Sequence, residues 1–299
     1  MDKIKISQSE NSKNGGVDHF VNLKRLKFHY VEWGSESSEP LLLLHGLRSS
    51  AETFDQLARS LCGKYRVIAI DQRGRGLTDW DPGRNYYPKE YVEDVVDFVK
   101  FLGLKKFHLL GHSMGGGNAI LYAGSYPDTV ASVVIEDSGP DASTSSEGAK
   151  RIREELKNTP IEFQSRLEAR KFWRSIRPKS TEISIESRIE NSMVVHDDGR
   201  VSWRHDQEGI AQSRLSTDLS RMPNLWPYVE AIRCPGLIIR GGNSDFLSRD
   251  VQTEMARRNP RLKIIEIENA GHYVHDDQPD RFISAVQNFL SDNPIVQRV

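Results

Sequence analysis

The sequence predicts an α/β protein in which a mostly parallel sheet is flanked by helices and carries an inserted helical cap. Apolar runs typical of buried strands alternate with segments of helical periodicity through 17–140 and again through 233–299. Between them, 141–232 is dense in Arg, Lys, Glu and Ser at helical spacing and has no clear buried strand. We therefore expect two core segments separated by a cap, after a polar N-terminal tail at 1–16 that we expect to be disordered.

Each core element follows from a local pattern. Two alternating runs on either side of Lys24-Arg25 predict a β-hairpin, and the later strands alternate with helices, as in a parallel sheet. The expected strands are 20–23, 26–33, 41–44, 65–70, 107–110, 130–135, 236–240 and 262–267. The expected helices are 51–61, 88–102, 118–126, 251–258 and 279–290 in the core, and 151–156, 163–176 and 186–193 in the insertion.

Composition excludes several classes of protein. The 299 residues suffice to bury a full α/β core, and the net charge of −1 gives no reason to expect nucleic acid or an anionic membrane as a partner. No apolar run approaches the roughly 20 residues that span a bilayer, and the N-terminus lacks the apolar segment of a secretion signal. Cys62 and Cys234 have no metal-like spacing, so we expect both to be reduced core residues and expect no metal site. We also expect a cytoplasmic protein that is a monomer or homodimer and needs no cofactor.

One motif stands at a strand-to-helix junction. Gly111-His112-Ser113-Met114-Gly115 follows the apolar run 107–110 and precedes a helix, which is the setting of a nucleophile elbow. The turn at such a serine is tight, so its flanking positions need almost no side chain. The sequence therefore predicts that Ser113 is a nucleophile.

Further candidates for catalysis fall where strands end. The active site of a parallel sheet lies at the carboxyl ends of its strands, and Ser113, Asp137 and Asp245 each follow a predicted strand, as does His272 after the last one. A serine hydroxyl needs a base to take its proton and an acid to orient that base. The order Ser…Asp…His along the chain fits Ser113, Asp245 and His272.

From about residue 17 to 290 the chain resembles an α/β-hydrolase fold serine hydrolase with a helical cap. The motifs that carry this resemblance are Leu-His-Gly-Leu at 44–47, Asp-Gln-Arg-Gly-Arg-Gly at 71–76, Gly-His-Ser-Met-Gly-Gly at 111–116, Gly-Gly-Asn-Ser-Asp at 241–245 and Gly-His at 271–272. The resemblance implies an oxyanion hole formed by the backbone N–H groups of Leu47 and Met114. Serine at 113 argues against the dehalogenases and epoxide hydrolases of this superfamily, which have an aspartate nucleophile.

The acid of the triad stays open between two residues. Asp245 is preferred, but some small esterases with a similar Asp-x-Gly-Pro draw the acid from the position of Asp137, and their later loop reads Gly-Gly-Asn-Ser without the aspartate. This sequence has both aspartates. His275 is a weaker candidate than His272 for the base.

The substrate is expected to be a small-molecule ester or acyl compound, with few residues to indicate its identity. Arg48 adjoins the oxyanion loop and is a candidate for binding a substrate carboxylate. Trp203 and Trp226 are candidates for lining an apolar pocket or for forming the cap's own core. Arg73 and Arg75 lack P-loop spacing, so a structural turn is expected there.

We therefore expect a serine hydrolase of the carboxylesterase type that works through an acyl-enzyme. The alternatives are a C–C bond hydrolase, lactonase, amidase or perhydrolase with the same triad, or a ligand receptor with vestigial hydrolysis.

Overall fold

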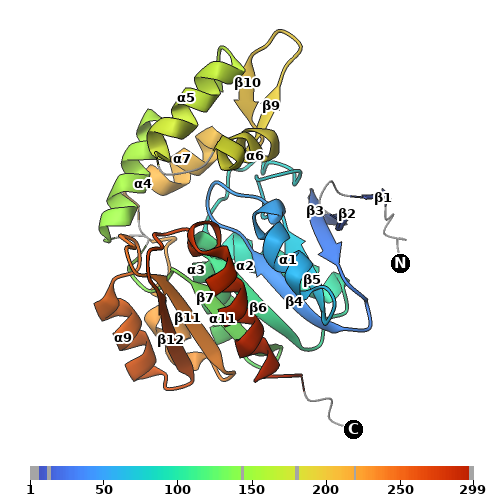
Figure 1. Cartoon of the computed structure of the whole chain (residues 1–299), viewed down its shortest axis with the longest axis vertical. Coiled ribbons are helices and arrows are strands. Elements are labelled where there is room, and N and C mark those ends of the chain that lie inside the picture. The colour runs from blue at the N-terminus through green and yellow to red at the C-terminus, as the bar shows by residue number, and fades with distance from the viewer. Residues whose placement is uncertain (1–6, 12–14, 143–144, 179–181, 219, 296–299) are drawn as a thin grey trace.

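A computed structural model describes residues 7–11, 15–142, 145–178, 182–218 and 220–295 (Figure 1). The chain forms an α/β core with a smaller cap at one end of it. Core and cap each have an apolar cluster of their own.

The described residues form one large sheet of nine strands in the order β1-β2-β3-β5-β4-β6-β7-β11-β12. The last six of these run parallel to one another, and the first three join antiparallel. The strands are β1 (Ser7–Asn11), β2 (Val17–Leu23), β3 (Leu26–Trp33), β4 (Glu39–Leu44), β5 (Tyr65–Ile70), β6 (Phe107–His112), β7 (Val130–Glu136), β11 (Gly236–Gly241) and β12 (Leu262–Ile267). The predicted hairpin and parallel strands are thereby confirmed.

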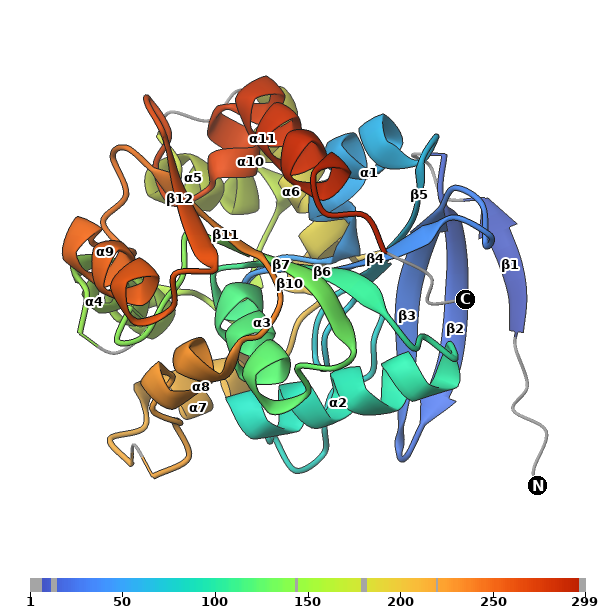
Figure 2. The same ribbon diagram turned by 90° about the horizontal axis from the view of Figure 1, so that it is seen from below.

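Helices cover both faces of the sheet (Figure 2). Helices α1 (Asp55–Leu61) and α11 (Pro279–Ser291) pack on one face, and α2 (Pro88–Phe101), α3 (Met114–Ser125) and α9 (Arg249–Arg258) pack on the other. Two short helices, η1 (Ala51–Phe54) and α10 (Val274–Asp277), complete the core. Coverage of both faces explains the continuous apolar run Leu41–Leu44, in which all four side chains are fully buried.

The cap contains four helices and a small sheet among the residues that the structure describes. The helices are α4 (Glu147–Asn158), α5 (Arg166–Ile176), α6 (Glu182–Ser192) and α7 (Gln207–Leu215), and the sheet is β8 (Glu162–Phe163), β10 (Val201–Trp203) and β9 (Met193–Val195). The expectation that the insertion has no buried strand is therefore wrong. Strands of two or three residues are too short to produce a recognisable alternation in the sequence.

Two expected boundaries also need correction. Residues 7–11 of the predicted disordered tail form β1, which pairs antiparallel with β2. Residues 226–231 fall within the expected cap at 141–232, but they form helix α8 (Trp226–Ala231), which packs against α3 and α9 of the core. A Cβ at Gly124 of α3 would lie 2.5 Å from the Tyr228 carbonyl oxygen, so a glycine permits this close approach.

Candidate active site

Ser113 lies at the sharp turn between β6 and α3. Its backbone has φ 54° and ψ −115°, a conformation that L residues rarely adopt. A Cβ on Gly111 would lie 2.1 Å from the carbonyl oxygen of Gly115, and one on Gly115 would lie 2.0 Å from that of Leu44. Both flanking positions therefore require glycine, and the turn presents the serine at the carboxyl end of a central strand.

Ser113, His272 and Asp137 form a continuous hydrogen-bonded chain. The Nε2 atom of His272 lies 2.8 Å from Ser113 Oγ, and its Nδ1 atom lies 2.7 Å from Asp137 Oδ2. All three residues are buried. Because a carboxylate accepts, Nδ1 carries the proton and Nε2 is free to accept from the serine hydroxyl.

The aspartate beside His272 is the alternative acid of the sequence analysis, and the preference for Asp245 is corrected here. Asp137 follows β7 and also accepts hydrogen bonds from Ser244 Oγ at 2.5 Å and from the Gly241 N–H at 3.2 Å. The loop after β11 thus contributes Ser244, which orients the carboxylate, instead of the carboxylate itself.

Asp245 has a different partner. Its two carboxylate oxygens accept from Nε and Nη2 of Arg151 on α4, at 2.8 and 3.1 Å, and its carbonyl oxygen accepts from the Gly148 N–H at 2.8 Å. Arg151 holds the pKa of Asp245 below its usual range. Asp245 therefore links the core to the cap.

Burial disfavours the charged forms of His272 and Asp137. It lowers the pKa of His272, and the nearby cations Arg177 and Arg151 lower it further. Burial raises the pKa of Asp137, against the hydrogen bonds from Ser244 and Gly241 that lower it. A histidine of low pKa is neutral at pH 7, which is the form that accepts a proton.

Leu47 and Met114, the expected oxyanion-hole residues, border the same cavity as Ser113. The Met114 N–H is the first of α3, where backbone donors have no partner within the helix. Arg75, which is fully buried, donates through Nε to the Leu47 carbonyl oxygen at 3.1 Å and approaches Met114 Sδ at 3.6 Å. Arg75 thus holds the Leu47 backbone and contacts the Met114 side chain, a role that its loop position alone did not reveal.

The cavity beside Ser113 encloses about 750 Å³ of non-atom space, with the open solvent at its mouth included. Its walls are mostly apolar and come from core and cap. They include Ile152 of α4, Phe246 after β11, and Met222 and Leu225 before α8. The Phe246 ring also lies 4.4 Å from the His272 ring, centroid to centroid. None of these four was singled out from the sequence, because their type and spacing resemble ordinary core residues.

The three residues proposed from the sequence for substrate contact lie elsewhere. Arg48 donates to Glu155 Oε2 at 3.4 Å and to Thr159 Oγ1 at 3.0 Å, and it is not among the cavity walls. Trp203 is buried in the cap's own apolar cluster. Trp226 donates to Asp141 at 3.1 Å and stacks under the Arg258 guanidinium at 4.3 Å, on the core side. The expectations for Arg48 and Trp226 are therefore corrected, and of the two alternatives for Trp203 the cap's own core is confirmed.

A second polar cluster lies beneath the triad. His275 donates to Glu136 Oε1 at 2.7 Å, and, against the effect of burial, Glu136 raises the pKa of His275. His112 Nε2 donates to the His272 carbonyl oxygen at 2.9 Å, and its Nδ1 has no hydrogen-bond partner among the described residues. Candidate ligand atoms of His112, Glu136 and His275 lie within 4.8 Å of one another, so these are the described residues that could hold a metal ion. His275 faces Glu136 and not Ser113, which leaves His272 as the histidine at the serine.

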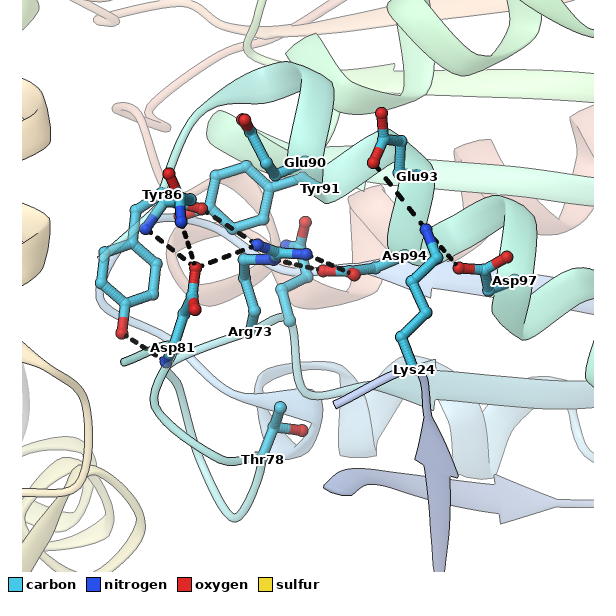
Figure 3. A network of polar contacts seen from close by, with 12 residues as sticks. Lys24, Arg73, Thr78, Asp81, Tyr86, Glu90, Tyr91, Glu93, Asp94 and Asp97 are labelled. Carbon is cyan, nitrogen blue, oxygen red and sulfur yellow. Dashed lines mark hydrogen bonds and ion pairs between the residues drawn. The ribbon is translucent and has the colours of Figure 1, made fainter. Parts of the chain in front are cut away.

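Arg73, in the loop after β5, is fully engaged in structural contacts (Figure 3). Arg73 donates to both carboxylate oxygens of Asp94, at 2.5 and 2.6 Å, and to Asp81 at 3.3 Å. With its charge matched by two carboxylates, Arg73 is not available to an anionic ligand. The predicted structural turn is confirmed.

Comparison with known proteins agrees with this geometry. A family model described as "Alpha/beta hydrolase family" matches residues 41–285. The chain belongs to the alpha/beta hydrolase family.

Relatives of this family are similar over nearly their whole length. The chain is 30% identical to the 2-(acetamidomethylene)succinate hydrolase of Mesorhizobium japonicum, over 91% of this chain and 96% of that protein. It is also 30% identical to the 3-hydroxybutyrate-oligomer hydrolase of Cupriavidus necator, over 90% of this chain and 94% of that protein. A crystal structure of E-2-(acetamidomethylene)succinate hydrolase superposes with a TM-score of 0.82 at 26% identity, covering 92% of this chain and 99% of that one. The relatives are hydrolases, and the family assignment makes this chain one of them. Among the described residues no helix is both long and apolar enough to cross a membrane.

Proposed function

We propose that the protein is a serine hydrolase that cleaves a carboxylic ester, or a related acyl bond, of a small molecule through an acyl-enzyme on Ser113. The observation that supports this most is the position of His272, which lies 2.8 Å from the Ser113 hydroxyl and 2.7 Å from the Asp137 carboxylate. Ser113 itself lines a mostly apolar cavity.

In acylation, Ser113 Oγ attacks the substrate carbonyl carbon while its proton passes to His272 Nε2. Asp137 accepts from Nδ1–H and stabilises the imidazolium that forms. The N–H groups of Leu47 and Met114 donate to the oxyanion, and a donor of this kind typically contributes a few kcal/mol. The imidazolium then gives its proton to the leaving alcohol oxygen as the carbon–oxygen bond breaks.

Deacylation repeats these steps with water. His272 takes a proton from a water molecule, whose oxygen attacks the acyl carbon of the ester on Ser113. The tetrahedral species collapses, the bond to Ser113 Oγ breaks, and the proton returns from His272 to the serine. One ester and one water give one alcohol and one acid.

The test is hydrolysis of p-nitrophenyl acetate, butyrate and octanoate by the wild type and Ser113→Ala. We expect turnover in the wild type and a loss of about 10³-fold or more in the variant, because only the oxyanion donors and binding remain. A fluorophosphonate should add to Ser113 in the wild type, as intact-mass measurement would show. A wild type that neither turns over these esters nor reacts with the phosphonate would contradict the proposal and favour a ligand receptor.

A further inference from the structure

The cavity beside Ser113 has an unbalanced charge. Two arginines, Arg153 of α4 and Arg214 of α7, are among its walls, and no described wall residue is an aspartate or glutamate. The whole chain is nearly neutral, with a net charge of −1, so this imbalance does not reflect composition. A cavity lined by one sign of charge favours a ligand of the opposite sign.

Arg214 has no ion-pair partner among the described residues, and its buried Nε has no hydrogen-bond partner there. Burial lowers the pKa of Arg214 and Tyr91 opposes this, while Arg75 and Arg153 lower it further. The charged side chains that most affect the pKa of Arg214 are therefore cations. An arginine keeps its charge in a protein even under these conditions.

Other arginines of the described chain, outside the cavity walls, differ from Arg214 in this respect. Arg48 donates to Glu155, Arg73 to Asp94 and Arg151 to Asp245. A charge that is removed from water without an ion-pair partner raises the free energy of the folded protein, and an anion in the cavity would offset that cost. The planar guanidinium offers two parallel N–H donors, which match the two oxygens of a carboxylate.

We propose that Arg214 binds a carboxylate of the substrate, so that the enzyme prefers acyl esters carrying a second, ionised carboxyl group. The inference rests on the proposed function and specifies the substrate class of the same site. The apolar walls would contact the carbon chain between the carboxylate at Arg214 and the ester carbonyl at Ser113.

The test compares two esters of equal chain length, mono-p-nitrophenyl adipate and p-nitrophenyl hexanoate, at pH 7.5. We expect wild-type kcat/KM to be higher for the anionic ester. In Arg214→Met, which keeps the length and apolar stem, the ratio of anionic to neutral kcat/KM should fall at least tenfold. Arg214→Lys should retain part of the preference. The exposed Arg84, which pairs with Glu208, supplies the matched control Arg84→Gln, with an unchanged ratio.

A binding measurement separates this inference from the chemistry. In a Ser113→Ala background, monomethyl adipate should bind at least tenfold more tightly than dimethyl adipate, and Arg214→Met should abolish the difference. Turnover of both p-nitrophenyl esters at equal kcat/KM by the wild type would overturn the role of Arg214 and leave the esterase function intact. A preference that persists in Arg214→Met would overturn it too. Failure to turn over either ester, with no difference in binding, would overturn both proposals.

Discussion

At the scale of single residues, backbone strain marks the proposed catalytic positions. Ser113 and Asp137 both have positive φ angles, 54° and 44°, although neither is a glycine. Such conformations persist only where the surroundings enforce them, and they gather at functional sites. Here the close approach of Gly115 to Leu44 enforces the first, and hydrogen bonds from Gly241 at the end of β11 and from Ser244 hold the side chain of the second.

The lowered pKa of His272 predicts the pH dependence of hydrolysis. Neutral imidazole is the active form, so activity falls only when pH drops through the pKa of His272. Burial and the cations Arg177 and Arg151 lower that pKa, so the acidic limb of kcat/KM should have its midpoint below 6.5.

The variant Arg177→Gln tests the cause of this shift. Removing a nearby cation favours the imidazolium, so the acidic limb should move to higher pH. A wild-type midpoint above 6.5, or a limb that moves to lower pH in the variant, would contradict this explanation.

At the scale of elements, a buried ion pair connects strand β3 to the loop after β5. His29 lies 2.7 Å from Asp71 and 3.1 Å from Asp18, and Asp71 also accepts from the Ala51 and Leu77 N–H groups. Burial alone would lower the pKa of His29, but the two carboxylates raise it to about 9.

This pair predicts how stability depends on pH. The pKa of His29 is about 9 when folded and near 6.5 when unfolded, so its contribution is fully present below pH 6.5 and is lost as pH rises through 9. That contribution is on the order of 3 kcal/mol. In urea unfolding, the difference between wild type and His29→Gln should shrink from pH 6.5 to pH 9.5. A difference that stays constant would show that His29 is not charged in the folded protein.

Core elements were predictable from the sequence, and cap elements less so. Buried core strands such as β4 have a continuous apolar run, Leu41–Leu44, and glycines bracket the elbow at Ser113. In the cap, β8–β10 are too short to show a pattern. Trp203 had no sequence feature that distinguishes a wall of the cavity from the cap's own core, where the structure places it.

At the scale of the whole molecule, the site is formed where the cap meets the core. The core supplies Ser113, Asp137 and His272, whereas the cap supplies walls that include Ile152 and Arg214. Spacing along the chain placed two aspartates at neighbouring strand ends. It could not show which carboxylate faces the histidine, because that depends on the ion pair between Asp245 and Arg151 of the cap helix α4.

The measurement that tests the proposed triad most directly compares Asp137→Asn with Asp245→Asn on p-nitrophenyl butyrate. Asp137→Asn should lower kcat by about 10³- to 10⁴-fold, because the histidine loses the acceptor that sets its tautomer. Asp245→Asn breaks a half-exposed ion pair that contributes only about 0–1 kcal/mol, so kcat should change by no more than a few-fold. Circular dichroism and thermal unfolding would confirm that both variants fold. A large loss in Asp245→Asn beside a small one in Asp137→Asn would contradict the proposed triad.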